Sequence, residues 1–292
     1  MSEIERIGVV GAGQMGAGIA EMSARAGCDV LVIEQGREAG ERARARILAS
    51  LDRAARGGKI STGEREQAAW RLRFGVDLGD LADRQLVVEA VSEDEQLKCH
   101  VVSTVDKVLD DRSAIVASNT SSIPIMKLAH GTGRPGSVIG LHFFNPVPVM
   151  PLVEVISSLT TSPAVRERAE SFLTRTLGKQ TIRAADRSGF VVNALLVPYL
   201  LSAMRMVETG RATPADVDAG MVAGCAHPMG PLRLADLIGL DTVAAIAESM
   251  YAEDREPLYA PPPLLRRMVQ AGLLGRKTGR GFHAYPQPEV VA

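Results

Sequence analysis

Cysteine is scarce in this sequence of 292 residues. The three cysteines, Cys28, Cys99 and Cys225, lie far apart, with no C-x-x-C pair and no histidine at ligand spacing. This pattern excludes a disulfide framework and a structural zinc site, and it predicts a reduced compartment and no bound metal.

An excess of charge of either sign is lacking as well. The chain has 33 basic and 34 acidic side chains, which gives a formal net charge of -1. Proteins whose main partner is nucleic acid usually carry a marked positive balance or a basic stripe. We therefore do not expect nucleic acid as the main partner.

Long hydrophobic runs are also missing. The most apolar segment, residues 190–204 (FVVNALLVPYLLSAM), is interrupted by Asn193, Pro198 and Ser202. It is too short and too polar to cross a membrane, so we expect a buried helix there. The N-terminal residues MSEIERIGVVGAG contain no apolar signal core, which predicts no membrane association and a cytoplasmic location.

Short β-rich runs are present and alternate with helical patterns up to about residue 185. The runs are RIGVV, DVLVIE, QLVVEAV, AIVASN and SVIGLHFF. This alternation is typical of a parallel sheet with helices on both faces. The rest of the chain has apolar helical patterns separated by Pro-rich breakers. We predict two domains, an α/β domain with a mainly parallel sheet over residues 1–186 and an all-α domain over residues 187–292.

The predicted helical domain is small and rich in apolar residues. We expect it to complete its core against a second copy, which predicts a homodimer. Within the first domain, residues 56–64 (RGGKISTGE) are the longest candidate for a mobile linker.

A glycine-rich loop follows the first apolar run. Gly11, Gly13 and Gly16 form a G-x-G-x-x-G pattern between a predicted strand and a predicted helix. The pattern suits a tight turn, a close approach to a pyrophosphate and close helix–sheet packing, and the helix N-terminus then faces the phosphates. A glycine-rich turn without a ligand is the alternative.

Glu34 strengthens the nucleotide interpretation, because it ends the second run DVLVIE, 18 residues after Gly16. A carboxylate there can accept hydrogen bonds from both adenosine ribose hydroxyls, and it repels a 2′-phosphate. We therefore predict a Rossmann-type domain that binds NAD rather than NADP. Arg37, three residues later, is the feature that argues the other way.

His142 lies near the end of the apolar run SVIGLHFF, toward the sheet edge where such folds bind ligands. Glu154 follows twelve residues later within the apolar run PLVEVI. A carboxylate in such a run is costly to bury without a partner, and an imidazole is a suitable one. A structural histidine is the alternative. The other four histidines fit surface or structural positions.

Two more polar residues stand in unexpected places. Ser121 follows the run AIVASN, and Asn193 lies in an apolar helical segment. Ser121 could instead cap the next helix, since serine is a favoured cap. Asn193 could instead be a buried structural amide.

Several motifs together resemble the L-3-hydroxyacyl-CoA dehydrogenase family, especially its short 3-hydroxybutyryl-CoA members. They are SNTSS, GLHFFNPVPVMPLVEVI, DRSGFVVNALLVPYL, HPMGPLRLADLIGLDT and GRKTGRGF. The resemblance covers nearly the whole chain and implies a two-domain, usually dimeric, NAD-dependent enzyme. The sequence departs from many relatives at Pro151, where they carry a lysine.

The resemblance implies roles for individual residues. The family's catalytic histidine falls on His142 and its paired acid on Glu154. Its substrate-binding serine and asparagine fall on Ser121 and Asn193. Contacts to the nicotinamide side of the cofactor fall on Glu93 and Lys98, which the residues alone would suggest are a charged helix start. These four catalytic and two cofactor positions join Gly11, Gly13, Gly16 and Glu34 as candidate site residues.

The expected activity is the interconversion of (S)-3-hydroxyacyl-CoA, in particular 3-hydroxybutyryl-CoA, and 3-oxoacyl-CoA with NAD(H). An acyl-CoA thioester is then the small-molecule partner, in fatty-acid, butyrate, polyester or aromatic metabolism. Two alternatives stay open, a dehydrogenase of a non-CoA hydroxy acid on the same scaffold and a non-catalytic NAD-binding protein.

Overall fold

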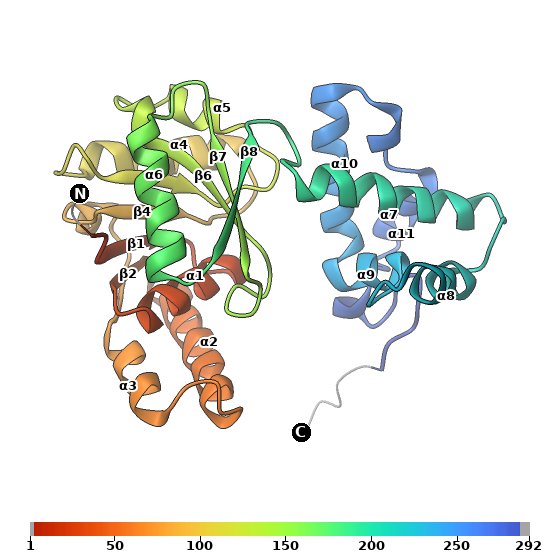
Figure 1. Ribbon diagram of the computed structural model, residues 1–292, viewed down its shortest axis with the longest axis horizontal. Helices are drawn as coiled ribbons and strands as arrows, with labels where there is room; N and C mark the ends of the chain where they lie inside the picture. Colours follow the sequence, from red (N-terminus) through yellow and green to blue (C-terminus); the bar gives the residue numbers. More distant parts are fainter. Residues whose placement is uncertain (1–2, 287–292) are drawn as a thin grey trace. The chain divides into compact units, whose positions relative to one another are not determined.

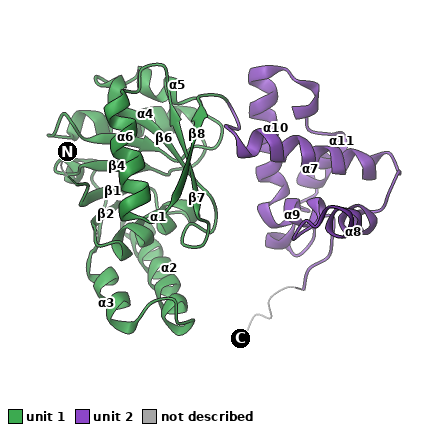
Figure 2. Cartoon of the chain, in the orientation of Figure 1, with its two compact units in different colours: residues 1–187 green, residues 188–292 purple. Residues whose placement is uncertain are grey.

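The computed structural model describes residues 3–286. The chain divides into two compact units, Met1–Arg187 and Ser188–Ala292 (Figure 2). Each unit has its own hydrophobic core. The division lies one residue beyond the domain boundary expected from the sequence.

The first unit is built on one eight-stranded sheet (Figure 1). Its strand order is β3-β2-β1-β4-β5-β6-β7-β8, and every pair is parallel except β6 with β7. The strands are β1 (Arg6–Val10), β2 (Asp29–Ile33), β3 (Leu72–Gly75), β4 (Leu86–Glu89), β5 (Ile115–Ser118), β6 (Val138–Phe143), β7 (Leu152–Ser157) and β8 (Gln180–Ala185). The predicted α/β class with a mainly parallel sheet is confirmed.

The central strands are buried on both faces, which explains their nearly continuous apolar sequences. All residues of β4, β5 and β6 are buried. The two edge strands, β3 and β8, are partly exposed and carry charged residues such as Arg73 and Arg183. These edge strands were not predicted from the sequence.

Helices cover the sheet of the first unit (Figure 1). Helix α1 contacts α2 and α3, whereas α4 contacts α5. The helices are α1 (Gln14–Arg25), α2 (Arg37–Arg56), α3 (Thr62–Trp70), α4 (Glu95–Val108), α5 (Ile125–His130) and α6 (Pro163–Ser171), which continues as a π-helical turn over Phe172–Thr176. Short 3₁₀ turns lie at Leu78–Leu81 and Pro135–Ser137.

Residues 56–64, expected as a mobile linker, instead end α2 and begin α3. Ser61 and Glu64 form a capping box, in which the Ser61 N–H donates to Glu64 Oε2 at 2.6 Å and the Glu64 N–H donates to Ser61 Oγ at 3.2 Å. Such reciprocal bonds satisfy the unpaired donors of a helix start. The connection between α2 and α3 is therefore short and structured.

The second unit is helical, as predicted. Its helices are α7 (Val192–Glu208), α8 (Pro214–Cys225), α9 (Pro231–Ile238), α10 (Leu240–Asp254) and α11 (Pro263–Gln270), with 3₁₀ turns at Pro257–Tyr259 and Arg276–Thr278. Proline opens α8, α9 and α11, where its missing N–H costs no helical hydrogen bond. Within residues 3–286, none of the helices combines the length and the apolar character needed to span a bilayer.

Candidate active site

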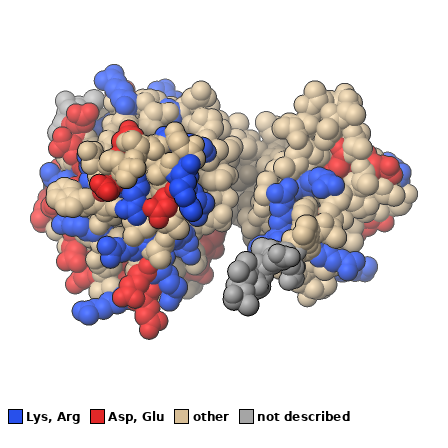
Figure 3. All heavy atoms as spheres, turned by 90° about the horizontal axis from the view of Figure 1, so that it is seen from below, with Lys and Arg blue, Asp and Glu red and all other residues tan. Residues whose placement is uncertain are grey.

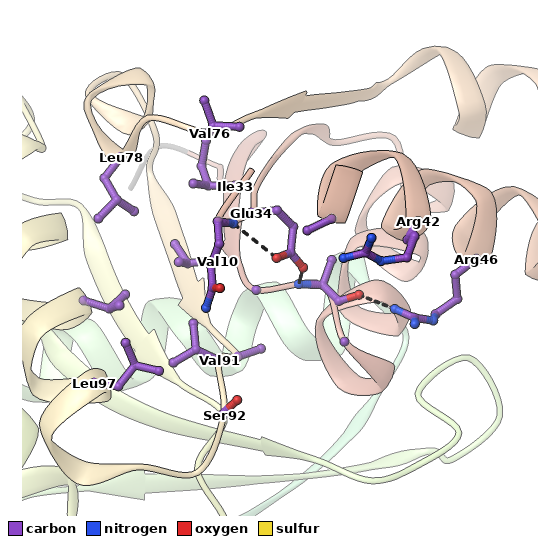
Figure 4. A pocket seen from close by; sticks show the side chains of 17 residues that line it. Val10, Ile33, Glu34, Arg42, Arg46, Val76, Leu78, Val91, Ser92 and Leu97 are labelled. Carbon is purple, nitrogen blue, oxygen red and sulfur yellow. Dashed lines mark hydrogen bonds between the residues drawn. The ribbon is translucent and has the colours of Figure 1, made fainter. Parts of the chain in front are cut away.

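A cavity of about 500 Å³ opens at the carboxyl ends of β1, β2 and β4 (Figure 4). Strand order reverses between β1 and β4, and open α/β sheets bind ligands at such a point. The walls of the cavity come from the glycine loop, the end of β2, helix α2 and the segment Ala90–Ser92 after β4. The position is the one expected for a dinucleotide.

The three glycines of the loop have separate structural reasons. Gly11 has a φ of 82°, a conformation that favours glycine. A Cβ on Gly16 would lie 1.9 Å from the Gly11 carbonyl oxygen, so only glycine permits this close contact between α1 and the loop. A Cβ on Gly13 would meet no described atom within 4 Å, which leaves its backbone open to a ligand.

Helix α1 begins directly after this loop. Its N-cap is Gly13, which offers no side-chain hydrogen bond, and its first turn contains no acidic residue. The first N–H groups of the helix therefore have no competing carboxylate beside them and can bind phosphate oxygens. The loop and the helix start together fit the pyrophosphate of a dinucleotide.

Glu34 lines the cavity next to the glycine loop. Its Oε1 accepts a hydrogen bond from the Ala12 N–H at 2.6 Å, and its Oε2 lies 3.4 Å from the Gln35 N–H. The carboxylate thus fastens the loop after β1 to the end of β2. Its remaining acceptor capacity faces the cavity, which suits a ribose hydroxyl.

His142 and Glu154 lie directly opposite each other on the antiparallel strands β6 and β7. The His142 Nδ1 is 2.7 Å from Glu154 Oε2, and the carboxyl-bearing residue is fully buried. Phe144 packs against the imidazole with ring centroids 4.7 Å apart. Because an ionised carboxylate only accepts hydrogen bonds, it selects the tautomer with hydrogen on Nδ1.

Ser121 faces the other nitrogen of the same ring. Its Oγ lies 3.2 Å from His142 Nε2. The capping alternative does not hold, because the first N–H groups of α5, from Ile125 and Met126, donate to the Asp186 carboxylate at 2.6 and 2.8 Å. Ser121 is thus free of a capping role and stands beside the imidazole.

Glu93 holds the loop that carries Ser121. The Glu93 Oε1 accepts from Thr120 Oγ1 at 2.5 Å and from the Ser121 N–H at 2.9 Å. It also accepts from the Ser122 N–H at 3.1 Å and the Ser122 hydroxyl at 3.0 Å. Burial alone would raise the pKa of this carboxyl, but the Lys98 charge and these hydrogen bonds outweigh it and hold the pKa below its usual value.

Lys98 is the charged partner of Glu93 and is almost fully buried, with 1% of its surface exposed. Its ammonium has three oxygen partners: Glu89 Oε1 at 2.7 Å, the Val91 carbonyl at 3.2 Å and Glu93 Oε2 at 3.4 Å. The contacts with Glu89 and Val91 are hydrogen bonds, and the contact with Glu93 is an ion pair. These contacts connect Lys98 to Glu93 and to the backbone at Val91, a residue that lines the cavity.

Glu89, Ser118 and Asn119 support this network and were not predicted from the sequence. Glu89 is fully buried and also accepts from the Ser118 hydroxyl at 2.6 Å and the Val91 N–H at 2.7 Å. Asn119 Oδ1 accepts from the Phe143 N–H at 2.9 Å and ties the loop after β5 to the end of β6. The only sequence signal for Glu89 is an acid within an apolar run, the same signal that identified Glu154.

Asn193 belongs to the second unit, where it is the second residue of α7 and is buried. The first unit therefore brings Ser121, His142 and Glu154 together, and the part played by Asn193 stays a prediction.

Two other histidines have partners within the second unit: His227 bonds to the Tyr199 hydroxyl at 3.1 Å, and His283 bonds to Asp218 at 2.7 Å.

Comparisons with known proteins cover almost the whole chain. Residues 6–187 match the model of the NAD binding domain of 3-hydroxyacyl-CoA dehydrogenase, and residues 189–285 match the model of its C-terminal domain. A 3-hydroxybutyryl-CoA dehydrogenase of Mycobacterium tuberculosis is 59% identical over 282 residues, which cover 97% of this chain and 99% of the relative.

Solved structures agree with these matches. The crystal structure of FadB2 from M. tuberculosis has a TM-score of 0.96 and 58% identity, and the match covers 98% of this chain and 100% of that one. The (S)-3-hydroxybutyryl-CoA dehydrogenase PaaH1 from Ralstonia eutropha has a TM-score of 0.92 and 42% identity, with the same coverage. The predicted family, fold class and cofactor are confirmed, and the chain belongs to the NAD-dependent 3-hydroxyacyl-CoA dehydrogenase family.

Proposed function

We propose that the protein interconverts (S)-3-hydroxyacyl-CoA and 3-oxoacyl-CoA with NAD(H), and that 3-hydroxybutyryl-CoA is its main substrate. Relatives at 59% and 42% identity are named for that substrate. The observation that carries the proposal is the His142 ring, with Glu154 2.7 Å from Nδ1 and Ser121 3.2 Å from Nε2. An imidazole held in this way can move the proton that accompanies a hydride.

His142 acts as the general base in oxidation and as the general acid in reduction. With hydrogen on Nδ1, the lone pair of Nε2 is available to the C3 hydroxyl of the substrate. When Nε2 takes that proton the ring becomes positively charged, and the buried Glu154 carboxylate stabilises the charge.

Ser121 and Asn193 orient the reacting group. A hydroxyl beside Nε2 can hydrogen-bond the substrate oxygen or the imidazole, and the role of Asn193 is the one that the family resemblance implies. Holding the reacting atoms about 3 Å apart in a productive orientation lowers the entropic part of the barrier.

Gly11, Gly13 and Gly16 would hold the cofactor's pyrophosphate at the start of α1, and Glu34 would hold the adenosine ribose. When bound, NAD supplies the hydride acceptor for oxidation and the hydride donor for reduction. Glu93 and Lys98 act as positioning residues on the nicotinamide side, because Glu93 fastens the Ser121 loop and Lys98 fastens Glu93.

The direct test is NADH oxidation by the purified protein with acetoacetyl-CoA, beside parallel reactions with free acetoacetate and with NADPH. Fast turnover with NADH and the thioester, and little with the free acid, would support the proposed substrate. Turnover of the free acid at a similar rate would favour a dehydrogenase of non-CoA hydroxy acids. A folded protein that binds NADH but turns over neither substrate would favour a non-catalytic NAD-binding protein.

The predicted homodimer is part of the proposal, and helix α8 supports it. Val222 on this helix is 43% exposed, and its neighbours Ala223, Gly224 and Cys225 are exposed as well. On the face in view, much of the second unit's surface carries no charged side chain (Figure 3). Residues 219–225 of α8 carry no charged side chain, and an exposed surface of this kind is typical of an interface, so we place the second copy on this part of α8. The cytoplasmic location expected from the sequence also stays a prediction.

A further inference from the structure

Two arginines face the nucleotide cavity from helix α2. Arg42 and Arg46 are one helical turn apart and both line the cavity that also contains Glu34. Figure 4 shows both side chains directed toward Glu34 and the glycine loop. Residues four apart share one face of a helix, so the two guanidinium groups form a pair on the same side of the cavity.

Arg46 is fixed on the loop, whereas Arg42 is solvated. The Arg46 Nη1 donates to the Ala12 carbonyl oxygen at 2.7 Å, which uses one of its five donors. The Arg42 Nη1 lies 3.8 Å from Glu38 Oε2, in an ion pair whose side chains are 68% and 93% exposed. Such an exposed pair contributes little, so Arg42 can exchange it for another anion.

Glu34 is the acidic group of the same cavity. Its hydrogen bonds with the Ala12 and Gln35 N–H groups, at 2.6 and 3.4 Å, keep the carboxylate beside the loop. A phosphate on the ribose 2′ position would place like charges next to each other, which is unfavourable. The cavity therefore contains both an anion that repels a 2′-phosphate and two cations suited to bind one.

We propose that Arg42 and Arg46 form a 2′-phosphate subsite, and that the charge of Glu34 alone keeps this subsite closed to NADP(H). Arg37, the arginine that the sequence suggests for this role, begins α2 and is exposed. Among the described residues that line the cavity, the arginines are Arg42 and Arg46. The inference concerns the NAD-binding unit and does not depend on which substrate the enzyme uses.

The test is direct binding of NADH and NADPH, followed by the change in nicotinamide fluorescence. In the Glu34→Gln variant the amide oxygen can still accept from the Ala12 N–H, while the negative charge is removed. We expect NADPH to bind at least about tenfold more tightly than to the wild type, because charged hydrogen bonds to phosphate replace a repulsion. NADH should lose only a few-fold in affinity.

Double variants identify the residues responsible. We expect Glu34→Gln/Arg42→Ala and Glu34→Gln/Arg46→Ala each to lose most of the gain for NADPH. The matched control is Glu34→Gln/Arg44→Ala, because Arg44 is exposed on the same helix but does not line the cavity. This control should keep the gain. NADH binding by every variant checks that its nucleotide site is folded.

Three results would overturn the proposal. The first is a Glu34→Gln variant that binds NADH but shows no gain for NADPH. The second is a gain that survives removal of both Arg42 and Arg46. The third is a gain abolished by Arg37→Ala, which would make Arg37 the phosphate partner. Should Glu34→Gln bind neither nucleotide, Glu34→Ser gives the same comparison without the longer amide.

Discussion

Glu154 lies opposite His142 in the β6–β7 pair, and its Oε2 is 2.7 Å from Nδ1 of the imidazole. Residues opposite each other on antiparallel strands place their side chains on the same face of the sheet. The spacing of twelve residues follows from this geometry, because the chain leaves β6, turns through residues 144–151 and returns along β7. The pairing of β6 with β7 therefore places the buried Glu154 carboxylate beside the imidazole, and no loop has to position it.

Replacing Glu154 by glutamine should reduce turnover. The substitution keeps the volume but removes the charge that stabilises the protonated ring. Hydrogen bonds to charged groups contribute roughly 1.5–3 kcal/mol, so we expect kcat to fall by about ten- to a hundredfold. Steady-state kinetics with acetoacetyl-CoA and NADH measure this. An unchanged kcat in a folded variant would show that Glu154 has only a structural role.

Glu93 should contribute stability that depends on pH. Its pKa in the folded protein lies below the usual 4.5 because Lys98 and the hydrogen bonds of residues 120–122 favour the ionised form, against the opposing effect of burial. A lowered pKa stabilises the fold above the unfolded-state pKa, and this contribution is lost as the pH falls through the folded-state value. The stability lost in Glu93→Gln should thus be largest near neutral pH and shrink below about pH 4.5.

Urea unfolding of the wild type and Glu93→Gln at several pH values checks this dependence. Glu95→Gln is a matched control, because it removes an exposed ion pair with Lys127 at 2.7 Å near the same helix start. Exposed pairs contribute about 0–1 kcal/mol, so its effect should be small. A stability difference for Glu93→Gln that stays constant down to pH 3 would contradict the assignment.

Lys98 neutralises Glu89 in the interior of the first unit, where both side chains are almost fully buried. Lys98→Met should leave an uncompensated buried carboxylate and destabilise the protein by roughly 3–5 kcal/mol. Adding Glu89→Gln should recover part of this loss, because the remaining group is then uncharged. Urea unfolding of the single and double variants measures both effects. If the stability lost in the double variant equals the sum of the losses in the two single variants, Lys98 and Glu89 are not coupled.

Val222→Asp should dissociate the proposed dimer. A charge placed at the centre of a buried apolar interface is costly to desolvate, whereas Val222 is 43% exposed in the single chain. Light scattering after size-exclusion chromatography should give a dimer for the wild type and a monomer for the variant. The control Ala252→Asp puts the same charge at an exposed position of α10 and should remain dimeric. A wild-type monomer would refute the dimer outright.

The sequence was informative wherever a local pattern determines a local structure. Buried parallel strands have nearly continuous apolar sequences, and the G-x-G-x-x-G pattern predicts the turn between β1 and α1. Edge strands carry no such pattern: all residues of β8 are exposed or partly exposed, and its Arg183 pairs with Glu170 at 2.6 Å. Neither β3 nor β8 could therefore be distinguished from a loop by hydrophobicity.

Long-range pairing within the site was harder to predict than its residues. Asp186, about 60 positions away in the sequence, accepts the hydrogen bonds at the start of α5. The residues near Ser121 therefore do not indicate that this serine has no capping role. Glu93 and Lys98 look like a charged helix start, yet Lys98 is buried through contacts with Glu89 and Val91. Such networks depend on which strands become neighbours, and this information lies in the topology of the sheet.

The central claim is that His142 moves the proton of the substrate hydroxyl. Its most direct test is kcat for acetoacetyl-CoA reduction by His142→Ala, measured together with NADH affinity by fluorescence. General acid–base help of this kind contributes roughly 10²–10⁴ in rate, so we predict a loss of that size with NADH binding largely kept. A His142→Ala enzyme that turns over at a rate close to the wild type would contradict the proposed mechanism.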